Sequence, residues 1–263
     1  MADDTSDIPK NAEPTNDEEF KKRYGERVGV GQSAVVYARN GVAAKVYREN
    51  QPHYQPFMEA FYIALVGELG LPVPKIYAVE TFLKQTAVLM DQVNGKSLYD
   101  LAMEDPARLE ETLDTVVEMQ IAMHKVSVGV FRPLKMVLGA NIAASPGLTP
   151  DEKERLNAML AKLPDGLAIC HGDFHGGNIL FDGKTYTIID WAEVACGAPA
   201  GDACRTYLDY YMGSKDIAGA YLTKYCAASG LSREEILAWL PVMAGSIYGF
   251  LSEEWKKQIR HLF

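Results

Sequence analysis

The pattern of hydrophobic and polar positions changes its period near residue 95. Before that point, β-prone runs flank the pair Asn40-Gly41, which is a strong signal for a β-hairpin. Apolar residues then recur at helical spacing between Pro52 and Gly70, which predicts a single helix. The runs that predict strands are 35–37, 42–47, 75–80 and 85–90.

Beyond residue 95 the pattern is mainly helical. Long segments with helical spacing predict helices over 106–126 and 150–163 and through much of 202–263. Short apolar runs lie at 167–170, 179–181 and 186–189, and the last two flank the turn 182–184, which predicts a short hairpin there. We therefore expect an α+β fold in which a small antiparallel sheet with one helix precedes a larger, mostly helical part.

Three segments are expected along the chain. Residues 1–19 hold seven acids and one base with little apolar surface to bury, which predicts a mobile acidic tail. Residues 20–93 are expected to form an N-terminal lobe, and residues 94–263 a C-terminal lobe. A connector at 91–95 would act as the hinge.

The composition is that of an ordinary globular enzyme, with 48% hydrophobic and 23% charged residues. No run approaches eighteen apolar residues and the N-terminus lacks a signal-peptide pattern, so we expect a cytoplasmic protein without a membrane partner. A net charge of -9 disfavours nucleic acid, which rewards clustered bases. The four cysteines show no Cys-x-x-Cys pair and indicate neither a zinc site nor a disulfide framework. Oligomeric state is not indicated.

The richest chemistry lies in residues 171–178, which read His-Gly-Asp-Phe-His-Gly-Gly-Asn. Phosphoryl transfer from a nucleotide needs a carboxylate that takes the acceptor's proton, and oxygen ligands that hold magnesium. Asp173 suits the first role. Asn178 and Asp190, twelve residues apart, suit the second, because magnesium prefers hard oxygen ligands.

This pattern resembles the catalytic and metal-binding motifs of the aminoglycoside phosphotransferase and choline kinase group, relatives of the protein kinases. The group's pattern is His-Gly-Asp, four residues, Asn, and later Ile-Asp-Trp, and each part is present here. The resemblance covers roughly residues 24–263 and implies a protein-kinase-like two-lobed fold with nucleotide in the cleft between the lobes. It implies that the N-terminal lobe, residues 20–93, binds the nucleotide and that the C-terminal lobe, residues 94–263, is the catalytic and acceptor-binding lobe. It also implies ATP or GTP with Mg²⁺ as cofactors and a small-molecule hydroxyl as acceptor.

Other site residues follow from the resemblance. Lys45, on the second strand of the hairpin, resembles the lysine that contacts the α- and β-phosphates, and Glu59 resembles the helix glutamate that pairs with it. Gly29, Gly31 and Ser33 resemble the glycine-rich phosphate loop. That loop departs from the protein-kinase pattern at residue 34, an alanine in place of a third glycine.

The resemblance extends to the hinge and to a supporting pair. Asp91 and Val93 occupy the place of the hinge that contacts adenine. His171 and Asp202 correspond to residues that brace the catalytic loop. Asp202 lies in a Gly-Asp-x-Ala-Arg element in which Cys204 replaces the alanine. Residues 190–192 read Asp-Trp-Ala with no activation-loop signature after them, which favours a small-molecule kinase over a protein kinase.

Two other readings stay open at this stage. His171, Asp173 and His175 could form a metal-hydrolase site, although that leaves Lys45 and Asn178 unexplained. The chain could also be a catalytically inactive nucleotide-binding protein on a kinase-like fold. No motif selects among an aminoglycoside-like antibiotic, an amino alcohol and a sugar as acceptor. His124 is expected to be a packed, hydrogen-bonded histidine outside the site.

Overall fold

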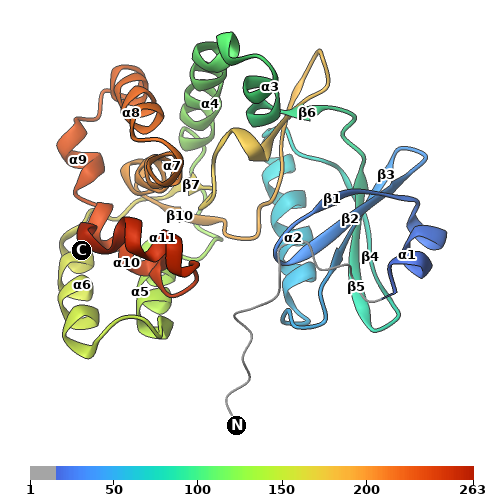
Figure 1. Cartoon of the computed structure of the whole chain (residues 1–263), viewed down its shortest axis with the longest axis horizontal. Helices are drawn as coiled ribbons and strands as arrows, with labels where there is room; N and C mark the ends of the chain where they lie inside the picture. Colours follow the sequence, from blue (N-terminus) through green and yellow to red (C-terminus); the bar gives the residue numbers. More distant parts are fainter. Residues whose placement is uncertain (1–15) are drawn as a thin grey trace. The chain divides into compact units, whose positions relative to one another are not determined.

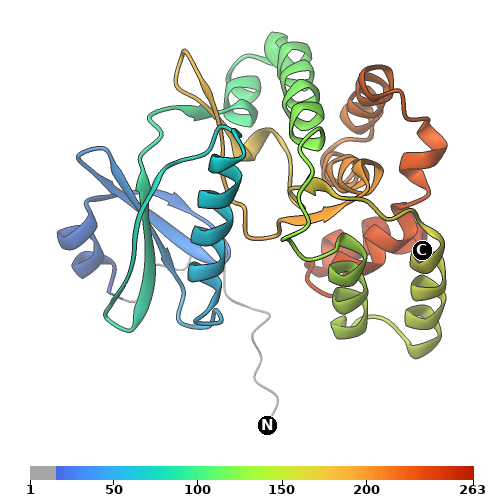
Figure 2. The same ribbon diagram turned by 180° about the vertical axis from the view of Figure 1, so that it is seen from behind.

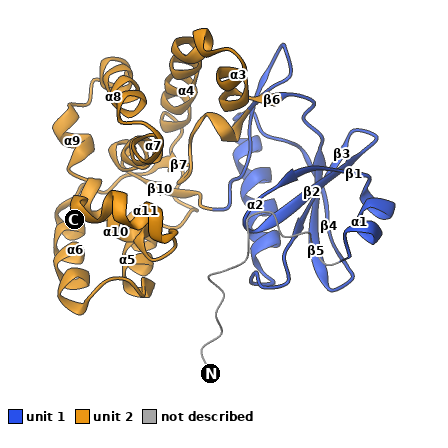
Figure 3. Cartoon of the chain, viewed as in Figure 1, with its two compact units in different colours: residues 1–95, 180–192 blue, residues 96–179, 193–263 orange. Residues whose placement is uncertain are grey.

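A computed structural model describes residues 16–263 and divides them into two compact units (Figure 3). Within the described residues, unit 1 comprises 16–95 and 180–192, and unit 2 comprises 96–179 and 193–263. The sequence-based division placed 180–192 in the later lobe. These residues join unit 1 because they bond to it: the N–H of Ile188 donates to the carbonyl of Pro72 at 2.7 Å.

Unit 1 begins with a short helix where the sequence suggested the end of a tail. Helix α1 (Asp17–Tyr24) buries Phe20 and Tyr24 in a cluster with Val35 and Tyr37, and the Tyr37 hydroxyl donates to Asp17 at 2.7 Å. The predicted tail, residues 1–19, extends too far at its end. Residues 17–19 form the first turn of α1, and the buried Phe20 holds that helix in place. The rest of the prediction, over 1–15, lies outside the described residues.

The sheet of unit 1 has five antiparallel strands in the order β1-β2-β3-β5-β4 (Figure 1). Asn40 and Gly41 adopt φ of 53° and 82°, the left-handed pair that a two-residue hairpin turn requires, so the predicted hairpin is confirmed. The strands are β1 (Glu26–Val30), β2 (Ala34–Arg39), β3 (Val42–Tyr47), β4 (Ile76–Phe82) and β5 (Gln85–Asp91).

The predicted single helix is α2 (Gln55–Glu68). Side chains alternate across a strand, so β3 sends Ala44 and Val46 to the cluster under α1, whereas Ala43 and Tyr47 join Ala60 of α2 in a second cluster. By this period of two, Lys45 belongs to the face that α2 covers.

Unit 2 is mostly helical (Figures 1 and 2). In it α7 packs against α8, and α8 against α4. Its helices are α3 (Leu98–Glu104), α4 (Leu109–His124), α5 (Leu134–Ala144), α6 (Pro150–Lys162), α7 (Pro199–Gly213), α8 (Lys215–Ser229), α9 (Arg233–Leu237), α10 (Leu240–Tyr248) and α11 (Glu253–Ile259). From 16 to 263, no helix has both the length and the apolar character that crossing a membrane requires.

Short strands flank the chemistry-bearing segment. In unit 2, β7 (Ala168–Cys170) pairs antiparallel with β10 (Ala195–Gly197), and β6 (Lys96–Ser97) opens the unit. The short strand β8 (Ile179–Phe181) begins at the last residue before the 180–192 segment of unit 1, and β9 (Tyr186–Ile188) lies within that segment. The segment 171–178 thus follows β7 directly and leads into β8. The α+β fold class, with its antiparallel sheet and mostly helical remainder, is confirmed.

Candidate active site

Lys45 of β3 lies between two carboxylates of unit 1. Its Nζ is 2.7 and 3.0 Å from the two oxygens of Glu59 on α2, and 2.8 Å from Oδ1 of Asp190. The side chain of Glu59 is 1% exposed and that of Asp190 is 45% exposed. The predicted pairing of lysine and glutamate is therefore present. The buried partner fixes the ammonium, and the exposed partner offers a carboxylate to solvent.

This arrangement keeps the lysine charged. Burial acts to lower the pKa of Lys45, but the negative charges of Glu59 and Asp190 outweigh it and raise the pKa above the ordinary value of 10.5. The pKa of Glu59 is raised by its burial, against the opposing effect of the lysine. A fixed cation with two acidic neighbours is suited to receive a polyphosphate.

Asp190 has an unusual backbone conformation. Its φ is 63°, in the left-handed region that only asparagine, aspartate and glycine visit with any frequency. Such a residue costs on the order of 1 kcal/mol and persists where the surroundings hold it. Its ion pair with Lys45 supplies such a restraint.

The residues predicted for the phosphate loop lie near the end of β1 and in the turn that follows it. Gly29 lies in β1 beside a bulge, while Gly31 and Ser33 belong to the turn before β2, where the N–H of Gly31 donates to the carbonyl of Ala34 at 2.8 Å. Arg48 anchors this turn, because its guanidinium donates to the carbonyls of Gly31 and Gln32 at 3.2 and 3.1 Å. The pattern of glycines gave no hint of Arg48.

The predicted hinge residues end β5. The carboxylate of Asp91 accepts the N–H of Lys75 at 3.0 Å and the hydroxyl of Tyr77, and its backbone N–H donates to the carbonyl of Lys75 at 3.0 Å. Val93, two residues on, is half-buried. The side chain of Asp91 and the backbone N–H groups of residues 91 and 92 are thus occupied by neighbours within unit 1.

In unit 2, the side chains of the catalytic loop, residues 171–178, converge on Asp173. The amide of Asn178 donates to the carbonyl of Asp173 at 2.9 Å and to its Oδ2 at 3.3 Å. Arg205 of α7 donates to Oδ1 at 2.9 Å, and Nε2 of His175 lies 3.7 Å from Oδ2. These contacts orient the carboxylate while leaving its side chain 33% exposed.

The neighbours of Asp173 keep it ionised. Burial would raise the pKa of Asp173, but the hydrogen bond of His175 and the positive charge of Arg205 outweigh it and hold the pKa well below 3.8. The guanidinium of Arg205 is itself shared with Asp209, one helical turn along α7. Asp173 is therefore a pre-positioned anion of the kind that orients an acceptor hydroxyl.

Asp202 of α7, the predicted supporting residue, is hydrogen-bonded to the segment 171–178. Its Oδ1 accepts the N–H of Gly172 at 2.8 Å, and its Oδ2 accepts from Nε2 of His124 at 2.9 Å and from Gln120 at 3.0 Å. The carboxylate is 1% exposed. Burial pushes its pKa up, while the bonds from His124, Gly172 and Gln120 bring it below 3.8.

Hydrogen bonds show the surroundings of two histidines, His124 and His171, for which the sequence predicted packing or support. His124 is 9% exposed, and its Nδ1 accepts from the hydroxyl of Tyr225 at 2.7 Å, so the prediction of a packed, satisfied histidine is confirmed. His171 is fully buried, and its Nδ1 accepts the N–H of Asp173 at 3.3 Å, which fits its predicted supporting role.

The donor set fits magnesium better than zinc or iron. Over the described part of the chain, no three residues of the His, Cys, Asp and Glu types gather as a metal site. The metal-hydrolase hypothesis therefore has no support. In addition, Nδ1 of His175 already accepts the N–H of Gly177 at 3.0 Å. By contrast, Oδ1 of Asn178 accepts no hydrogen bond from the described residues, and the carboxylate of Asp190 is accessible. Hard oxygen donors of this kind suit magnesium.

Comparison with known proteins decides the family. The sequence model of the phosphotransferase enzyme family matches residues 25–239, most of the chain. The chain belongs to this phosphotransferase enzyme family. The predicted resemblance is thereby confirmed, as is the prediction of a small-molecule kinase. No curated protein sequence matches this phosphotransferase.

Solved structures share the fold of this phosphotransferase at low identity. Choline kinase LicA from Streptococcus pneumoniae is 12% identical, with 93% of this chain and 96% of that chain covered at a TM-score of 0.66. A choline/ethanolamine kinase family protein from Mesorhizobium loti is 14% identical (90% and 86% covered, TM-score 0.63). A thermostable mutant of aminoglycoside phosphotransferase APH(4)-Ia, in ternary complex with ADP and hygromycin B, is 14% identical (89% and 90% covered, TM-score 0.65).

Sequence reasoning missed several residues that shape this site. Arg205 was noted only as part of the Gly-Asp-x-Ala-Arg element, yet it is the cation beside Asp173. Gln120 is a fully buried amide that bonds Asp202 and Thr206 at 3.0 Å each. The hydroxyl of Tyr210 accepts the N–H of Gly176 at 3.3 Å. A polar residue at a buried helical position, as Gln120 is, was the available signal.

Proposed function

We propose that this phosphotransferase transfers the γ-phosphoryl group of ATP to a hydroxyl of a small molecule, with Asp173 as the catalytic base. The observation that carries the proposal is that Asp173 is held as an anion by Arg205 and His175 yet remains partly exposed. An ionised, oriented carboxylate can accept the hydroxyl's hydrogen bond and take its proton as the phosphoryl group is transferred.

The nucleotide would be held by unit 1. Lys45, fixed by Glu59, would place its ammonium against the α- and β-phosphates, and the backbone at Gly29, Gly31 and Ser33 would cover the phosphates. The backbone at Asp91 and Val93 would contact the base. Two solved structures of one relative of the same fold, variants of aminoglycoside phosphotransferase APH(4)-Ia, contain ADP or AMP-PNP, which supports a nucleotide here.

Magnesium would be held by Asn178 through Oδ1 and by Asp190 through its exposed carboxylate. When bound, the ion would offset the charge of the phosphates. The residues of this chain supply the rest: Lys45 restrains Asp190, and the Asp173 carbonyl restrains the Asn178 amide so that its oxygen faces away.

The acceptor class is an aminoglycoside-like antibiotic, an amino alcohol or a sugar. The relatives named above are a choline kinase, a choline/ethanolamine kinase family protein, and an aminoglycoside phosphotransferase crystallised with hygromycin B. Choline, ethanolamine and hygromycin B each carry a hydroxyl together with a cationic nitrogen. The cytoplasm is the proposed location.

A catalytically inactive nucleotide-binding protein is the alternative function. It predicts that at least one part of the machinery is missing or misdirected. Lys45, Asp173, Asn178 and Asp190 are all present, and each is held by a specific partner. These contacts favour the enzyme.

The proposal is tested by a screen of hydroxyl acceptors from the three classes for magnesium-dependent release of ADP, followed by mass spectrometry of the product. We expect one class to give a product heavier by one phosphoryl group. Tight binding of ATP without a phosphorylated product from any class, and without slow ATP hydrolysis, would instead support the inactive alternative.

A further inference from the structure

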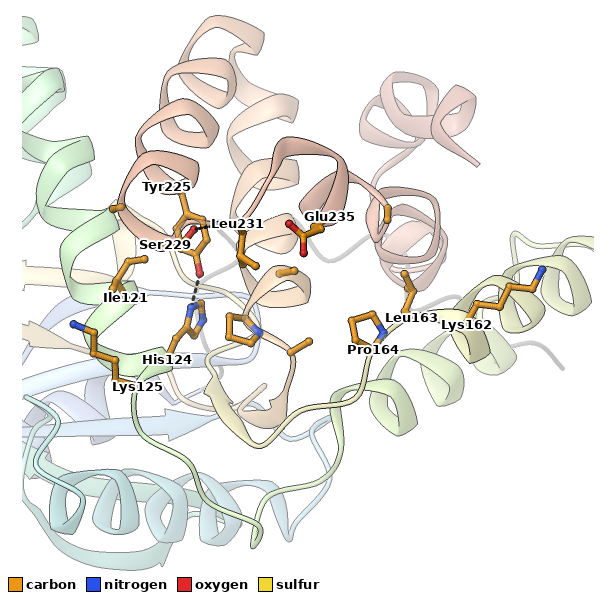
Figure 4. Close-up of a pocket in the computed structure, with 15 residues that line it drawn as sticks. Ile121, His124, Lys125, Lys162, Leu163, Pro164, Tyr225, Ser229, Leu231 and Glu235 are labelled. Carbon is orange, nitrogen blue, oxygen red and sulfur yellow. Dashed lines mark hydrogen bonds between the residues drawn. The ribbon is translucent and has the colours of Figure 1, made fainter.

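A cavity of about 610 Å³ lies within unit 2 (Figure 4), and Asp173 is not among the residues that line it. That volume lies in the range of sites for small organic ligands. Its walls are largely apolar and include Ile121, Leu163, Pro164 and Leu231. Nothing in the phosphoryl-transfer mechanism uses this cavity, although Tyr225 and His124 form part of its lining.

The charged groups of the lining differ in direction. Figure 4 shows the carboxylate of Glu235 among the lining side chains, whereas the ammonium groups of Lys125 and Lys162 extend toward opposite sides of the cavity, away from its middle. Oε2 of Glu235 accepts the N–H of Ser232 at 2.8 Å in the cap of α9. Glu235 is exposed, and its Oε1 has no hydrogen bond to the described residues, so one carboxylate oxygen at the open side of the cavity is available to a ligand.

Helix ends add to this negative character. The C-terminal turns of α4, α6 and α8 all line the cavity, through Ile121 and His124, Lys162, and Ala228 and Ser229. The C-terminal end of a helix carries a partial negative charge. One long helix, α7, presents its N-terminal end here. Three negative ends and the carboxylate of Glu235 outweigh it, and the ammonium groups of Lys125 and Lys162 point away, so the side of the cavity near Glu235 favours a cation.

We propose that this cavity is a second ligand site of the enzyme and that it binds an organic amine. The ammonium group would pair with Glu235, and an apolar body about the size of a phenyl ring would lie against Ile121, Leu163 and Leu231. The site differs from the acceptor site, because its ligand needs no hydroxyl and receives no phosphoryl group.

A chain of hydrogen bonds joins this site to the catalytic loop. The hydroxyl of Tyr225, in the cavity wall, donates to Nδ1 of His124, and Nε2 of His124 donates to Asp202. Asp202 in turn accepts the N–H of Gly172, the residue before Asp173. A ligand that shifts Tyr225 or His124 therefore alters the brace behind the catalytic base, and occupancy of the cavity changes the turnover rate.

Calorimetry with 2-phenylethylamine tests the binding site directly, since this probe has no hydroxyl to be phosphorylated. We expect the full-length protein to bind it, and to bind phenylacetate or 2-phenylethanol at least tenfold more weakly, as an ion pair with Glu235 requires. Glu235→Gln, which retains an acceptor for the helix cap, should weaken binding of the amine about tenfold or more. Glu234→Gln, an exposed neighbour outside the lining, is the matched control and should bind as the unmodified chain does.

A second pair of variants separates the cavity from the active site. Ala228 lines the cavity and Ala227 does not, although both are exposed on α8. Ala228→Trp should abolish binding of the probe, whereas Ala227→Trp should retain it. Binding that survives Ala228→Trp, or that does not distinguish the amine from the carboxylate, overturns the site. These readouts do not depend on catalysis, so their failure is separate from a failure of the proposed kinase activity.

The coupling is tested by the rate of ADP release with saturating 2-phenylethylamine. We expect the rate to change at least twofold in the unmodified enzyme and to stay constant in Ala228→Trp. A probe that binds calorimetrically without changing the rate would overturn the coupling through His124 and Asp202.

Discussion

Lys45 and Asp190 form an ion pair of 2.8 Å, although 145 positions separate them in the chain. The pair returns residues 180–192 to unit 1, beside the strand and helix that carry Lys45 and Glu59. One ammonium thereby serves a buried and an exposed carboxylate. The exposed one, Asp190, is the proposed ligand of magnesium, while Glu59 keeps the lysine in place.

Loss of the Lys45 charge should lower the stability of the fold as well as the activity. Lys45→Met leaves the carboxylate of Glu59 buried without its cation, which costs on the order of 3–5 kcal/mol of unfolding free energy. Urea denaturation measures this loss. Lys22→Met, which removes an exposed lysine paired with Glu19, is the control and should unfold at the urea concentration of the unmodified chain. Equal stability of the two variants would show that the Lys45 pair is not structural.

Glu59→Gln should impair use of the nucleotide more than it impairs the fold. The neutral amide keeps the shape of the side chain but no longer fixes the ammonium by charge. Loss of a charge-assisted hydrogen bond is worth about 1.5–3 kcal/mol, or roughly 10- to 100-fold in kcat/KM for ATP. Steady-state kinetics at varied ATP checks this. A kcat/KM within twofold of the unmodified enzyme would argue that Lys45 needs no partner.

Local sequence signals predicted the parts of the fold that local physics determines. Asn40-Gly41 predicted the β2–β3 hairpin because only a left-handed pair makes that turn, and the spacing of apolar residues predicted α2. Helix α5 was missed, because Leu134, Val137 and Leu138 share the helix with further apolar residues and leave no polar stripe to reveal its period.

The candidate site was predictable in its residue types and in the pairing of Lys45 with Glu59, but not in the contacts of Asp173. The spacing of Asp173, Asn178 and Asp190 matched a known motif. The motif identified these residues but gave no information about which side chains they contact. The cation beside Asp173 comes from Arg205, 32 positions later, and depends on how α7 packs. Such partners are set by tertiary packing, which a single sequence does not display.

Because Asp202 is buried as an anion behind residues 171–178, the free energy of unfolding should fall at acid pH. The folded pKa of Asp202 lies below 3.8, so its stabilising contribution is complete above pH 3.8 and is lost as the pH falls through the folded pKa. Asp202→Asn removes this contribution, because one amide cannot accept from Gly172, His124 and Gln120 together. We expect it to lower the unfolding free energy by roughly 1–3 kcal/mol at pH 7.

Urea denaturation from pH 7 to pH 3 measures that dependence. The difference between Asp202→Asn and the unmodified chain should be constant down to about pH 5 and should shrink below pH 3.8. Asp114→Asn, at an exposed carboxylate paired with Lys224, controls for general loss of charge. A difference that grows toward acid would show that Asp202 is not stabilised as an anion.

Gly172 should not tolerate a side chain. Its φ is 85°, and a Cβ there would lie 2.6 Å from the carbonyl oxygen of Glu193. Gly172→Ala should therefore lose about 1–3 kcal/mol of stability from backbone strain and should also displace Asp173 and reduce kcat. Gly230→Ala is a matched control, because Gly230 has φ of 77° with open space around it. If both variants lost kcat equally, a cause other than the crowding at Gly172 would be indicated.

The most direct test of the central claim is the single-turnover rate of Asp173→Asn with a reactive acceptor, measured beside its affinity for magnesium and ATP. If Asp173 is the base, the rate of phosphoryl transfer should fall by about 10²–10⁴-fold while the Kd for the nucleotide changes less than about threefold. A variant that transfers the phosphoryl group at the unmodified rate would contradict the account.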